Sequence, residues 1–136
     1  PMIFAGDEIG MTGTWGEDSR QPMPWDQRDN WDLDTLRRYR ELIALRLTHP
    51  ALRSGGHRWV RLDDDAIVFL RESQHERLLI LAARASSAPI VLPARALGLT
   101  LEAAVNVYGG AADLLPDPTV VVLPEDGPTF QVWSLP

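Results

Sequence analysis

The sequence predicts a mixed fold, in which a strand, a loop and a helix of a larger α/β body precede an all-β antiparallel sandwich. Two changes of pattern favour this fold class. A short apolar run at 2–5 ends at two acids, and a helical period of apolar residues follows at 36–47. From residue 58 onward the period changes to two, with turn residues between short runs. We place the domains at 1–54 and 55–136.

The first segment predicts a buried strand over 2–5, followed by a long polar loop over 6–30. A loop of that length in a compact domain is uncommon unless it serves a site. The acids Asp7 and Glu8 stand at the strand's end, the place where barrel strands deliver polar groups to a site. Because neighbours on a strand point to opposite faces, the two carboxylates cannot both face one reacting bond. We therefore expect Asp7 and Glu8 to support the site through hydrogen bonds to loop amides or to an arginine.

A helix is predicted next, with Asp32 or Asp34 as its N-cap. Its apolar positions recur at steps of three and four residues, namely Leu36, Tyr39, Leu42, Ile43 and Leu47. The pair His49-Pro50 should end it, because a residue before proline is disfavoured in the α region. We expect residues 51–57 to form a linker or a tight crossing. One strand and one helix cannot bury their own apolar surface, so this part requires the rest of a sheet.

The second part reads as a small β domain. Seven β-rich runs are predicted at 58–62, 66–72, 77–83, 90–92, 104–108, 120–123 and 129–135. Turn residues separate them at 63–65, 86–87, 109–110, 116–118 and 125–128. This spacing is typical of an antiparallel sandwich. Because Trp59, Phe69, Tyr108, Phe130 and Trp133 lie in apolar runs, we interpret most of these aromatics as core and the domain as structural.

Composition narrows the classes of function. The net charge of −6 argues against a protein that tracks nucleic-acid phosphates, and all 13 basic residues are arginine. Without cysteine there is no thiolate metal site, and an acidic run at 63–65 is more typical of a solvated turn than of calcium binding. We predict no metal, cofactor or membrane partner. The chain starts on Pro1, so we expect its N-terminal part to be missing; the location stays open, with the cytoplasm preferred.

Three loop residues are candidates for binding. The guanidinium of Arg20 offers several fixed donors to the oxygen atoms of a ligand or to a carboxylate, although it could instead pair with Asp18 or Glu17 and hold the loop. Met23 and Trp25 could form an apolar wall of a ligand subsite, or could anchor the loop.

The first part of the chain resembles the α-amylase family, glycoside hydrolase family 13, from the eighth barrel strand onward. The residues that carry the resemblance are Phe4-Ala5-Gly6-Asp7-Glu8-Ile9-Gly10-Met11, Arg20-Gln21-Pro22-Met23-Pro24-Trp25-Asp26, Leu36-Arg37-Arg38-Tyr39-Arg40-Glu41-Leu42-Ile43-Ala44-Leu45-Arg46 and His49-Pro50-Ala51-Leu52. It is strong up to about residue 54 and looks closest to the α-glucosidase, oligo-1,6-glucosidase and neopullulanase-like branches.

The resemblance implies that residues 1–54 are the last βα unit of a TIM (β/α)8 barrel whose N-terminal part is the missing partner. Members of the family are retaining enzymes, in which one aspartate attacks the anomeric carbon, a glutamate protonates the leaving oxygen and a second aspartate stabilises the transition state. In the family these three lie on or after earlier strands, so no catalytic residue is expected here. The implied substrate is an α-glucan or α-glucoside, and Arg20 is implied to bind it.

Two alternatives remain open at this point. One is a stand-alone β-sandwich that binds carbohydrate or a protein partner. The other is a glucosyl transferase or isomerase of the same family, which differs from the hydrolase in the acceptor of the glucosyl group. Because the catalytic Asp, Glu and Asp are expected to be absent from this chain, we expect the chain alone to be inactive.

Overall fold

The computed structural model describes residues 1–86, 88–99, 102–115, 119–124 and 126–136. Contacts between Cα atoms divide the chain into two compact units, Pro1–Leu45 and Arg46–Pro136. The boundary at 54/55 stays a prediction.

The N-terminal unit contains short helical turns within the predicted loop over 6–30, and no strand over 2–5. Three single 3₁₀ turns span Asp7–Ile9, Asp18–Arg20 and Arg28–Asn30. The predicted strand over 2–5 is wrong, because these residues belong to no strand in the described part of the chain. A strand is stabilised by ladder hydrogen bonds to a neighbour, and this unit supplies no neighbouring strand among its described residues.

Helix α1, Leu33–Thr48, follows the sequence prediction closely. Oδ1 of Asp32 accepts the backbone N–H groups of Asp34 at 3.0 Å and Thr35 at 2.9 Å, so Asp32 is the N-cap. These hydrogen bonds, the one from the Thr35 amide first, hold the pKa of the Asp32 carboxyl below its usual range. The helix ends before His49-Pro50, as predicted. None of its residues is buried, and Leu33 and Leu47 are 64% and 63% exposed.

Helix α2, Pro50–Ser54, replaces most of the linker predicted over 51–57. Proline at the first helical position is favourable, because its fixed φ suits the helix and its missing N–H has no partner there. The first turn is also stabilised from outside, since Oε2 of Glu76 accepts the Ala51 N–H at 2.8 Å. Ala51 is fully buried. The predicted end of α1 at His49-Pro50 is therefore right, but the sequence did not predict the second helix that begins at Pro50.

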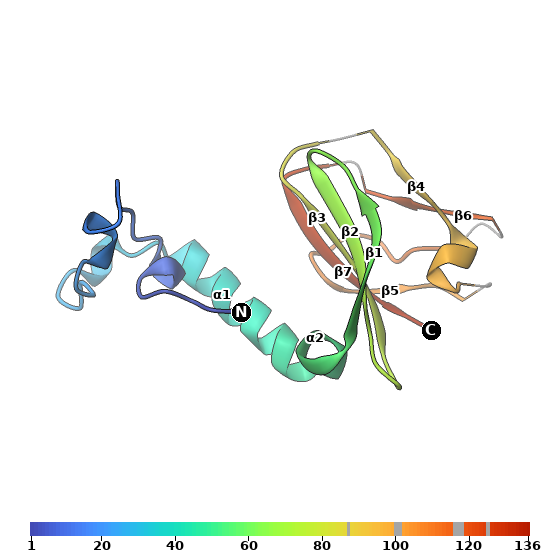
Figure 1. Cartoon of the computed structure of the whole chain (residues 1–136), viewed down its shortest axis with the longest axis horizontal. Helices are drawn as coiled ribbons and strands as arrows, with labels where there is room; N and C mark the ends of the chain where they lie inside the picture. The colour runs from blue at the N-terminus through green and yellow to red at the C-terminus, as the bar shows by residue number, and fades with distance from the viewer. Residues whose placement is uncertain (87, 100–101, 116–118, 125) are drawn as a thin grey trace. The chain divides into compact units, whose positions relative to one another are not determined.

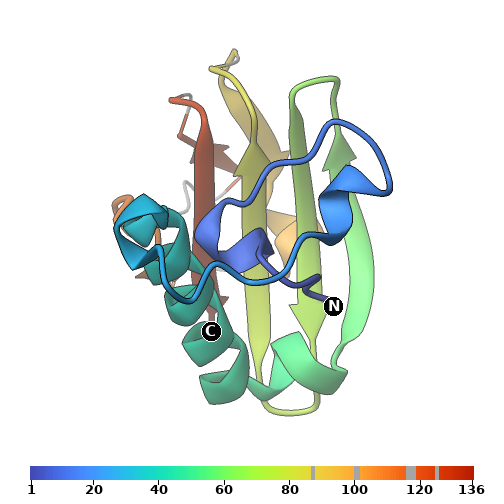
Figure 2. The same cartoon turned by 90° about the vertical axis from the view of Figure 1, so that its left-hand side faces the viewer.

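Within its described residues, the β domain has the seven strands that the sequence predicts. They are β1 (Gly56–Leu62), β2 (Ala66–Glu72), β3 (Arg77–Ala83), β4 (Ile90–Pro93), β5 (Val105–Tyr108), β6 (Val120–Leu123) and β7 (Thr129–Leu135). They form a five-stranded sheet of order β1-β2-β3-β7-β5 and a two-stranded sheet β4-β6, antiparallel throughout (Figures 1 and 2). The predicted turns at 86–87, 116–118 and 125–128 lie wholly or partly outside the described residues.

The core lies between the two sheets. One cluster of buried residues includes Val68 and Leu70 of β2, Leu81 of β3, Val121 of β6 and Trp133 of β7. Strand β2 alternates between buried and partly exposed positions, which is the period of two seen in the sequence. The antiparallel β domain predicted from the sequence is therefore confirmed.

The aromatic residues of this domain only partly follow the prediction. Trp133 is fully buried, and its indole N–H donates to the Ala112 carbonyl at 3.0 Å. In contrast, Trp59 and Phe130 are 53% and 37% exposed, and Phe69 and Tyr108 are only partly buried, so the interpretation of most of these aromatics as core is wrong. Both stand in apolar runs. An apolar run does not specify which face of a sheet is covered.

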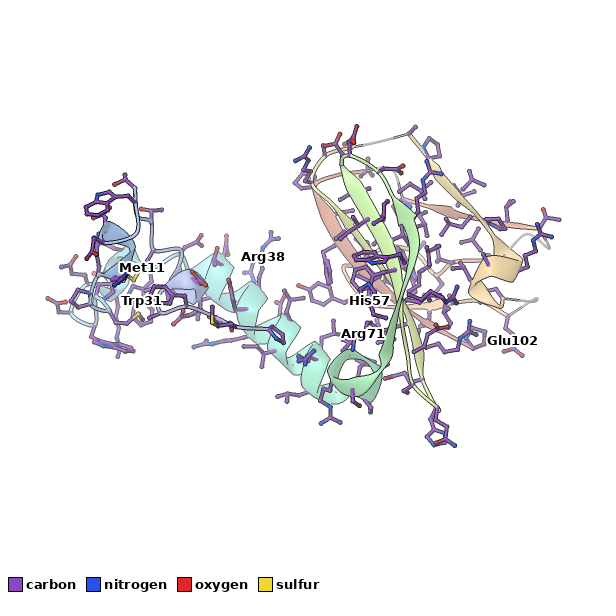
Figure 3. All side chains as sticks on the ribbon, viewed as in Figure 1. Met11, Trp31, Arg38, His57, Arg71 and Glu102 are labelled. Carbon is purple, nitrogen blue, oxygen red and sulfur yellow. The ribbon has the colours of Figure 1, made fainter. Side chains whose placement is uncertain are left out.

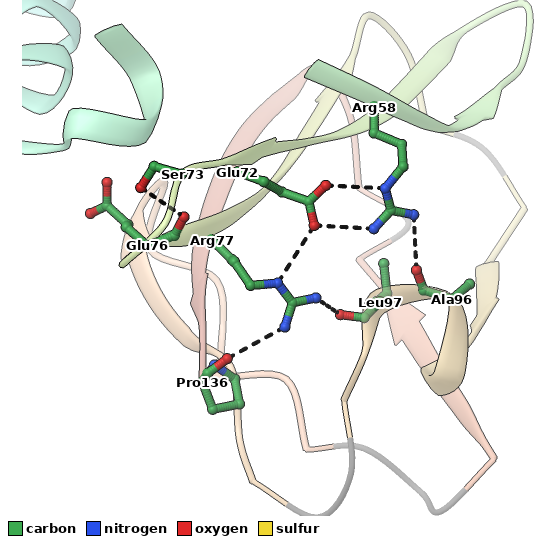
Figure 4. A network of polar contacts seen from close by, with 8 residues as sticks. All are labelled: Arg58, Glu72, Ser73, Glu76, Arg77, Ala96, Leu97 and Pro136. Atoms are coloured by element: carbon green, nitrogen blue, oxygen red, sulfur yellow. Dashed lines mark hydrogen bonds and ion pairs between the residues drawn. The ribbon is translucent and has the colours of Figure 1, made fainter. Parts of the chain in front are cut away.

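An arginine and glutamate network joins the ends of β1, β2 and β3 to the 3₁₀ turn Ala94–Leu97 (Figure 4). Glu72 accepts from Arg58 through both carboxylate oxygens, at 3.1 Å and 3.2 Å, and lies 3.5 Å from Nε of Arg77. Arg58 also donates to the Ala96 carbonyl at 3.1 Å, and Arg77 donates to that of Leu97. The hydrogen bond from Arg58 is the main reason why the pKa of Glu72 is lowered.

Candidate functional site

The loop after residue 5 is shaped by two glycines in left-handed conformations. Gly6 has φ 96° and Gly10 has φ 71°. A side chain at Gly6 would overlap Met11, so this turn has both a conformational and a steric need for glycine. Figure 3 shows Met11 and Trp31 in this unit. The Asp32 N–H also donates to the Ile9 carbonyl at 3.0 Å, which joins the start of the loop to the start of α1.

Asp7 and Glu8 bond to the backbone beside them. Oδ2 of Asp7 accepts the Phe4 N–H at 2.9 Å, and Oε2 of Glu8 accepts the Gly6 N–H at 3.1 Å. The sequence places these acids on a strand, but they lie in the 3₁₀ turn Asp7–Ile9. The opposite-face argument therefore does not apply to them. Their support of a substrate site stays a prediction.

Arg20 ends the second 3₁₀ turn, and its side chain is exposed. The described residues offer it no ion pair with Glu17 or Asp18. Asp18 instead bonds to Thr14 and to Gln21, so its carboxylate is occupied by neutral donors. The Arg20 backbone N–H donates to the Glu17 carbonyl at 3.1 Å. The loop thus presents a guanidinium whose charge is not neutralised by the neighbouring acids of the described chain.

Trp25 and Met23 differ in exposure. Trp25 is 62% exposed and meets Trp31 edge to face, with ring centroids 5.8 Å apart, whereas Met23 is partly buried. Trp31 is held by a hydrogen bond from its indole N–H to the Pro24 carbonyl at 3.2 Å, with the Arg28 guanidinium 5.5 Å from its ring centroid. Trp31 is not among the site residues predicted from the sequence. Its position six residues after Trp25, beyond a polar loop, was the available signal.

A shallow groove lies elsewhere in the N-terminal unit. Its volume is about 300 Å³, and the side chains that line it come from Ile3–Ala5, Glu8 and the α1 residues Leu36, Tyr39, Arg40 and Ile43. Arg20, Met23 and Trp25 do not line it. Of the predicted site residues, Glu8 alone lines this groove.

The acidic turn at 63–65 is occupied by arginines. Arg61 donates to Asp63 and Arg84 donates to Asp65, both at 2.7 Å. Within the described ranges, no cluster of three His, Cys, Asp or Glu side chains is placed to hold a metal ion. In the same ranges, no helix is both long and apolar enough to cross a membrane.

Comparisons with known proteins identify the region to which this chain corresponds. A cyclomaltodextrinase from Geobacillus thermopakistaniensis is 35% identical over 114 residues, which are 81% of this chain and 18% of that protein. Neopullulanase 2 from Thermoactinomyces vulgaris is 35% identical over 80 residues, 57% of this chain and 14% of that protein. The chain thus spans less than a fifth of the length of these relatives. No family model matches the chain.

Solved structures also match this chain with only part of their own length. The cyclic α-maltosyl-(1→6)-maltose hydrolase of Arthrobacter globiformis matches 99% of this chain with 26% of its own, at 26% identity and a TM-score of 0.70. A cyclomaltodextrinase matches 96% of this chain with 22% of its own; its TM-score of 0.79 at 23% identity shows a shared fold.

The chain is therefore homologous to the C-terminal region of α-glucan hydrolases, in which a short helical segment is followed by antiparallel sheets. The resemblance seen in the sequence is confirmed: the chain corresponds to the C-terminal region of the α-amylase family, glycoside hydrolase family 13.

Proposed function

We propose that this chain is the C-terminal part of a retaining glycoside hydrolase that cleaves α-glucosidic bonds in maltooligosaccharides or related α-glucans. The relatives support the substrate class, because they are named for cyclomaltodextrin, pullulan and cyclic maltosyl-maltose. A debranching enzyme from Nostoc punctiforme, 25% identical, was also solved after soaking with acarbose. In this proposal residues 1–54 complete a (β/α)8 barrel, and the β domain covers and steadies it.

The observation that carries the proposal is the state of Arg20. Its guanidinium is exposed. In the described structure it forms no ion pair with the neighbouring acids, and Asp18 bonds to Thr14 and Gln21 instead. A planar guanidinium with several fixed donors suits two neighbouring sugar hydroxyls or a carboxylate of the site. We assign Arg20 to substrate binding, Met23 and the exposed ring of Trp25 to an apolar wall of the same subsite, and Asp7 and Glu8 to support of the loop.

The bond-breaking groups are assigned to another part of the protein. A retaining mechanism needs a carboxylate nucleophile and a carboxylic acid on opposite sides of one glycosidic bond. Asp7 and Glu8 do not suit these roles, because both carboxylates are engaged by backbone amides at their own turn. The 136-residue chain should therefore show no turnover of α-glucosides on its own.

The test uses the protein expressed from the reading frame that contains this chain. With maltooligosaccharides and cyclomaltodextrin, Arg20→Ala should raise KM about tenfold, because a charge-assisted hydrogen bond is lost. The control is Arg95→Ala, a change of another exposed arginine in the β domain. Hydrolysis by the isolated 136-residue chain, or an Arg20→Ala enzyme with unchanged kinetics, would contradict the assignment. Product analysis would separate hydrolysis from transfer to a sugar acceptor, the family alternative.

A second candidate function is carbohydrate binding by the β domain. The rings of His57, Trp59 and Phe69 form a cluster on β1 and β2, with centroid separations of 4.4 Å to 5.6 Å, and Trp59 is 53% exposed. Exposed aromatic faces can stack on sugars. Titration calorimetry of the chain with maltoheptaose tests this candidate. Saturable binding that Trp59→Ala removes favours it, and absence of heat favours a structural role.

A further inference from the structure

One carboxylate holds both ends of the segment from Thr14 to Gln21. Oδ2 of Asp18 accepts the Thr14 N–H at 2.9 Å and the Thr14 hydroxyl at 3.1 Å. Oδ1 of the same side chain accepts the Gln21 side-chain amide at 3.0 Å. Three donors therefore converge on a single group from four residues before it and three residues after it. Arg20 lies inside the segment that they close.

All three donors are neutral, so the Asp18 carboxylate is hydrogen-bonded without using the charge of Arg20. A carboxylate two residues away would ordinarily be a ready partner for a guanidinium. Here the three hydrogen bonds stabilise the ionised carboxylate of Asp18 and lower its pKa, the bond from the Thr14 amide most strongly. Asp18 thus shapes the loop and keeps its charge, while the Arg20 guanidinium stays exposed.

We propose that Asp18 is a positioning residue that acts through Arg20: its carboxylate fixes the loop in which Arg20 presents its guanidinium to an α-glucan. The inference rests on the proposed function, because it takes Arg20 as the residue that contacts substrate. The backbone of Arg20 is fixed within this segment by its hydrogen bond to the Glu17 carbonyl. Preorganisation of this kind lowers the entropic cost of binding, because the loop is already ordered before the substrate arrives.

A double-mutant cycle tests the proposal in the enzyme expressed from the reading frame that contains this chain. Asp18→Ala should raise KM for maltooligosaccharides about tenfold and leave kcat within about twofold, because hydrogen bonds to a charged group are lost. In an Arg20→Ala background the same change should add less than about twofold, because a positioning residue has no effect once its target is gone.

Two matched controls accompany the cycle. Thr14→Ser keeps both the backbone N–H and a hydroxyl donor, so KM should stay near that of the parent. Glu17→Ala removes an exposed acid from the same loop and should also leave KM unchanged. If Asp18→Ala does not fold, Asp18→Asn serves in its place, because it keeps one acceptor oxygen but cannot accept from both Thr14 and Gln21 as a carboxylate does.

The possible outcomes distinguish a failure of the positioning role of Asp18 from a failure of the proposed function. If Arg20→Ala impairs binding while Asp18→Ala and Asp18→Asn do not, the positioning role is overturned and the proposed function stands. Equal losses from Asp18→Ala with and without Arg20 also overturn it, since they indicate general damage. If Arg20→Ala itself changes nothing, the proposed function is overturned together with the inference that rests on it.

Discussion

His49 Nδ1 lies 2.6 Å from Oε1 of Glu76, although the two residues are 27 positions apart in the sequence. Their side chains are only 17% and 20% exposed. The other oxygen of Glu76 accepts the Ala51 N–H. One carboxylate from the turn between β2 and β3 therefore fixes the junction where α1 ends and α2 begins, which ties this junction to the β domain.

Removal of Glu76 should destabilise the β domain. Glu76→Ala loses the contact with His49 and leaves the Ala51 N–H at the start of α2 without its acceptor, which together cost about 2 kcal/mol. Urea unfolding followed by tryptophan fluorescence measures the free energy of unfolding. The matched control is His75→Ala, because His75 is an exposed neighbour in the same turn. Equal stability of the two variants would argue that the junction is not held by Glu76.

Two neighbouring valines in β6 test the placement of the core. Val121 is 1% exposed and faces the cluster between the sheets, whereas Val122 is 53% exposed. Val121→Ala should cost about 1–3 kcal/mol and Val122→Ala less than about 0.5 kcal/mol, since only the first removes buried apolar surface. Thermal and urea unfolding give both values. Similar losses at the two positions would place β6 in a different register or on a different face.

Alanine substitutions at two adjacent glycines distinguish the cost of a strained backbone conformation from the cost of a steric clash. Gly109 and Gly110 have φ values of 101° and 79°, so alanine is strained at both. A Cβ at Gly109 would also overlap the Phe130 carbonyl and the Gln131 side chain, while a Cβ at Gly110 would meet open space. Gly110→Ala should cost about 1 kcal/mol and Gly109→Ala at least about 2 kcal/mol more. An equal cost, measured by urea unfolding, would mean that the turn relaxes around the added methyl group.

Glu72 makes stability depend on pH in the acid range. Because its hydrogen bond with Arg58 lowers its pKa in the folded state, its contribution is complete above the pKa of the unfolded state. The contribution starts to disappear below about pH 4.3 and is lost as the pH falls through the lower, folded-state pKa. Glu72→Gln should lower stability at pH 7 by about 1 kcal/mol and flatten the loss between neutral and acid pH.

The measurement for Glu72 is the unfolding free energy from pH 7 to pH 3, with Glu102→Gln as the control because Glu102 is exposed in the β domain. A parent protein and a Glu72→Gln variant with parallel pH curves would show that this carboxylate is not linked to folding.

The β domain could be predicted well because its information is local. The runs at 66–72, 77–83, 120–123 and 129–135 have the bounds of β2, β3, β6 and β7, since alternation and turn residues both act over a few positions. Burial of single aromatics could not be predicted, because Trp59 and Trp133 both lie in apolar runs. The strand register places Trp133 opposite Leu79, on the face that packs in the core cluster, and places Trp59 opposite Phe69 on the other face.

The N-terminal segment was predicted less well because its information is not local. An apolar run at 2–5 has strand character, but a strand forms only beside another strand, and this unit has none among its described residues. Within the loop, the sequence singled out Arg20 by its chemistry. It named Asp18 only as a possible ion-pair partner of Arg20, and did not predict its hydrogen bonds to Thr14 and Gln21, although Thr and Asp side chains in loops commonly bond to nearby backbone.

The proposed function assigns Arg20 of this chain to the substrate site of an α-glucan hydrolase. The KM for maltooligosaccharides tests this assignment when it is measured for the parent enzyme, Arg20→Ala and Arg95→Ala, each expressed from the reading frame that contains this chain. We expect a KM about tenfold higher for Arg20→Ala alone. An unchanged KM of the Arg20→Ala enzyme would contradict this assignment. So would the absence of α-glucan hydrolase activity from the parent protein expressed from that reading frame.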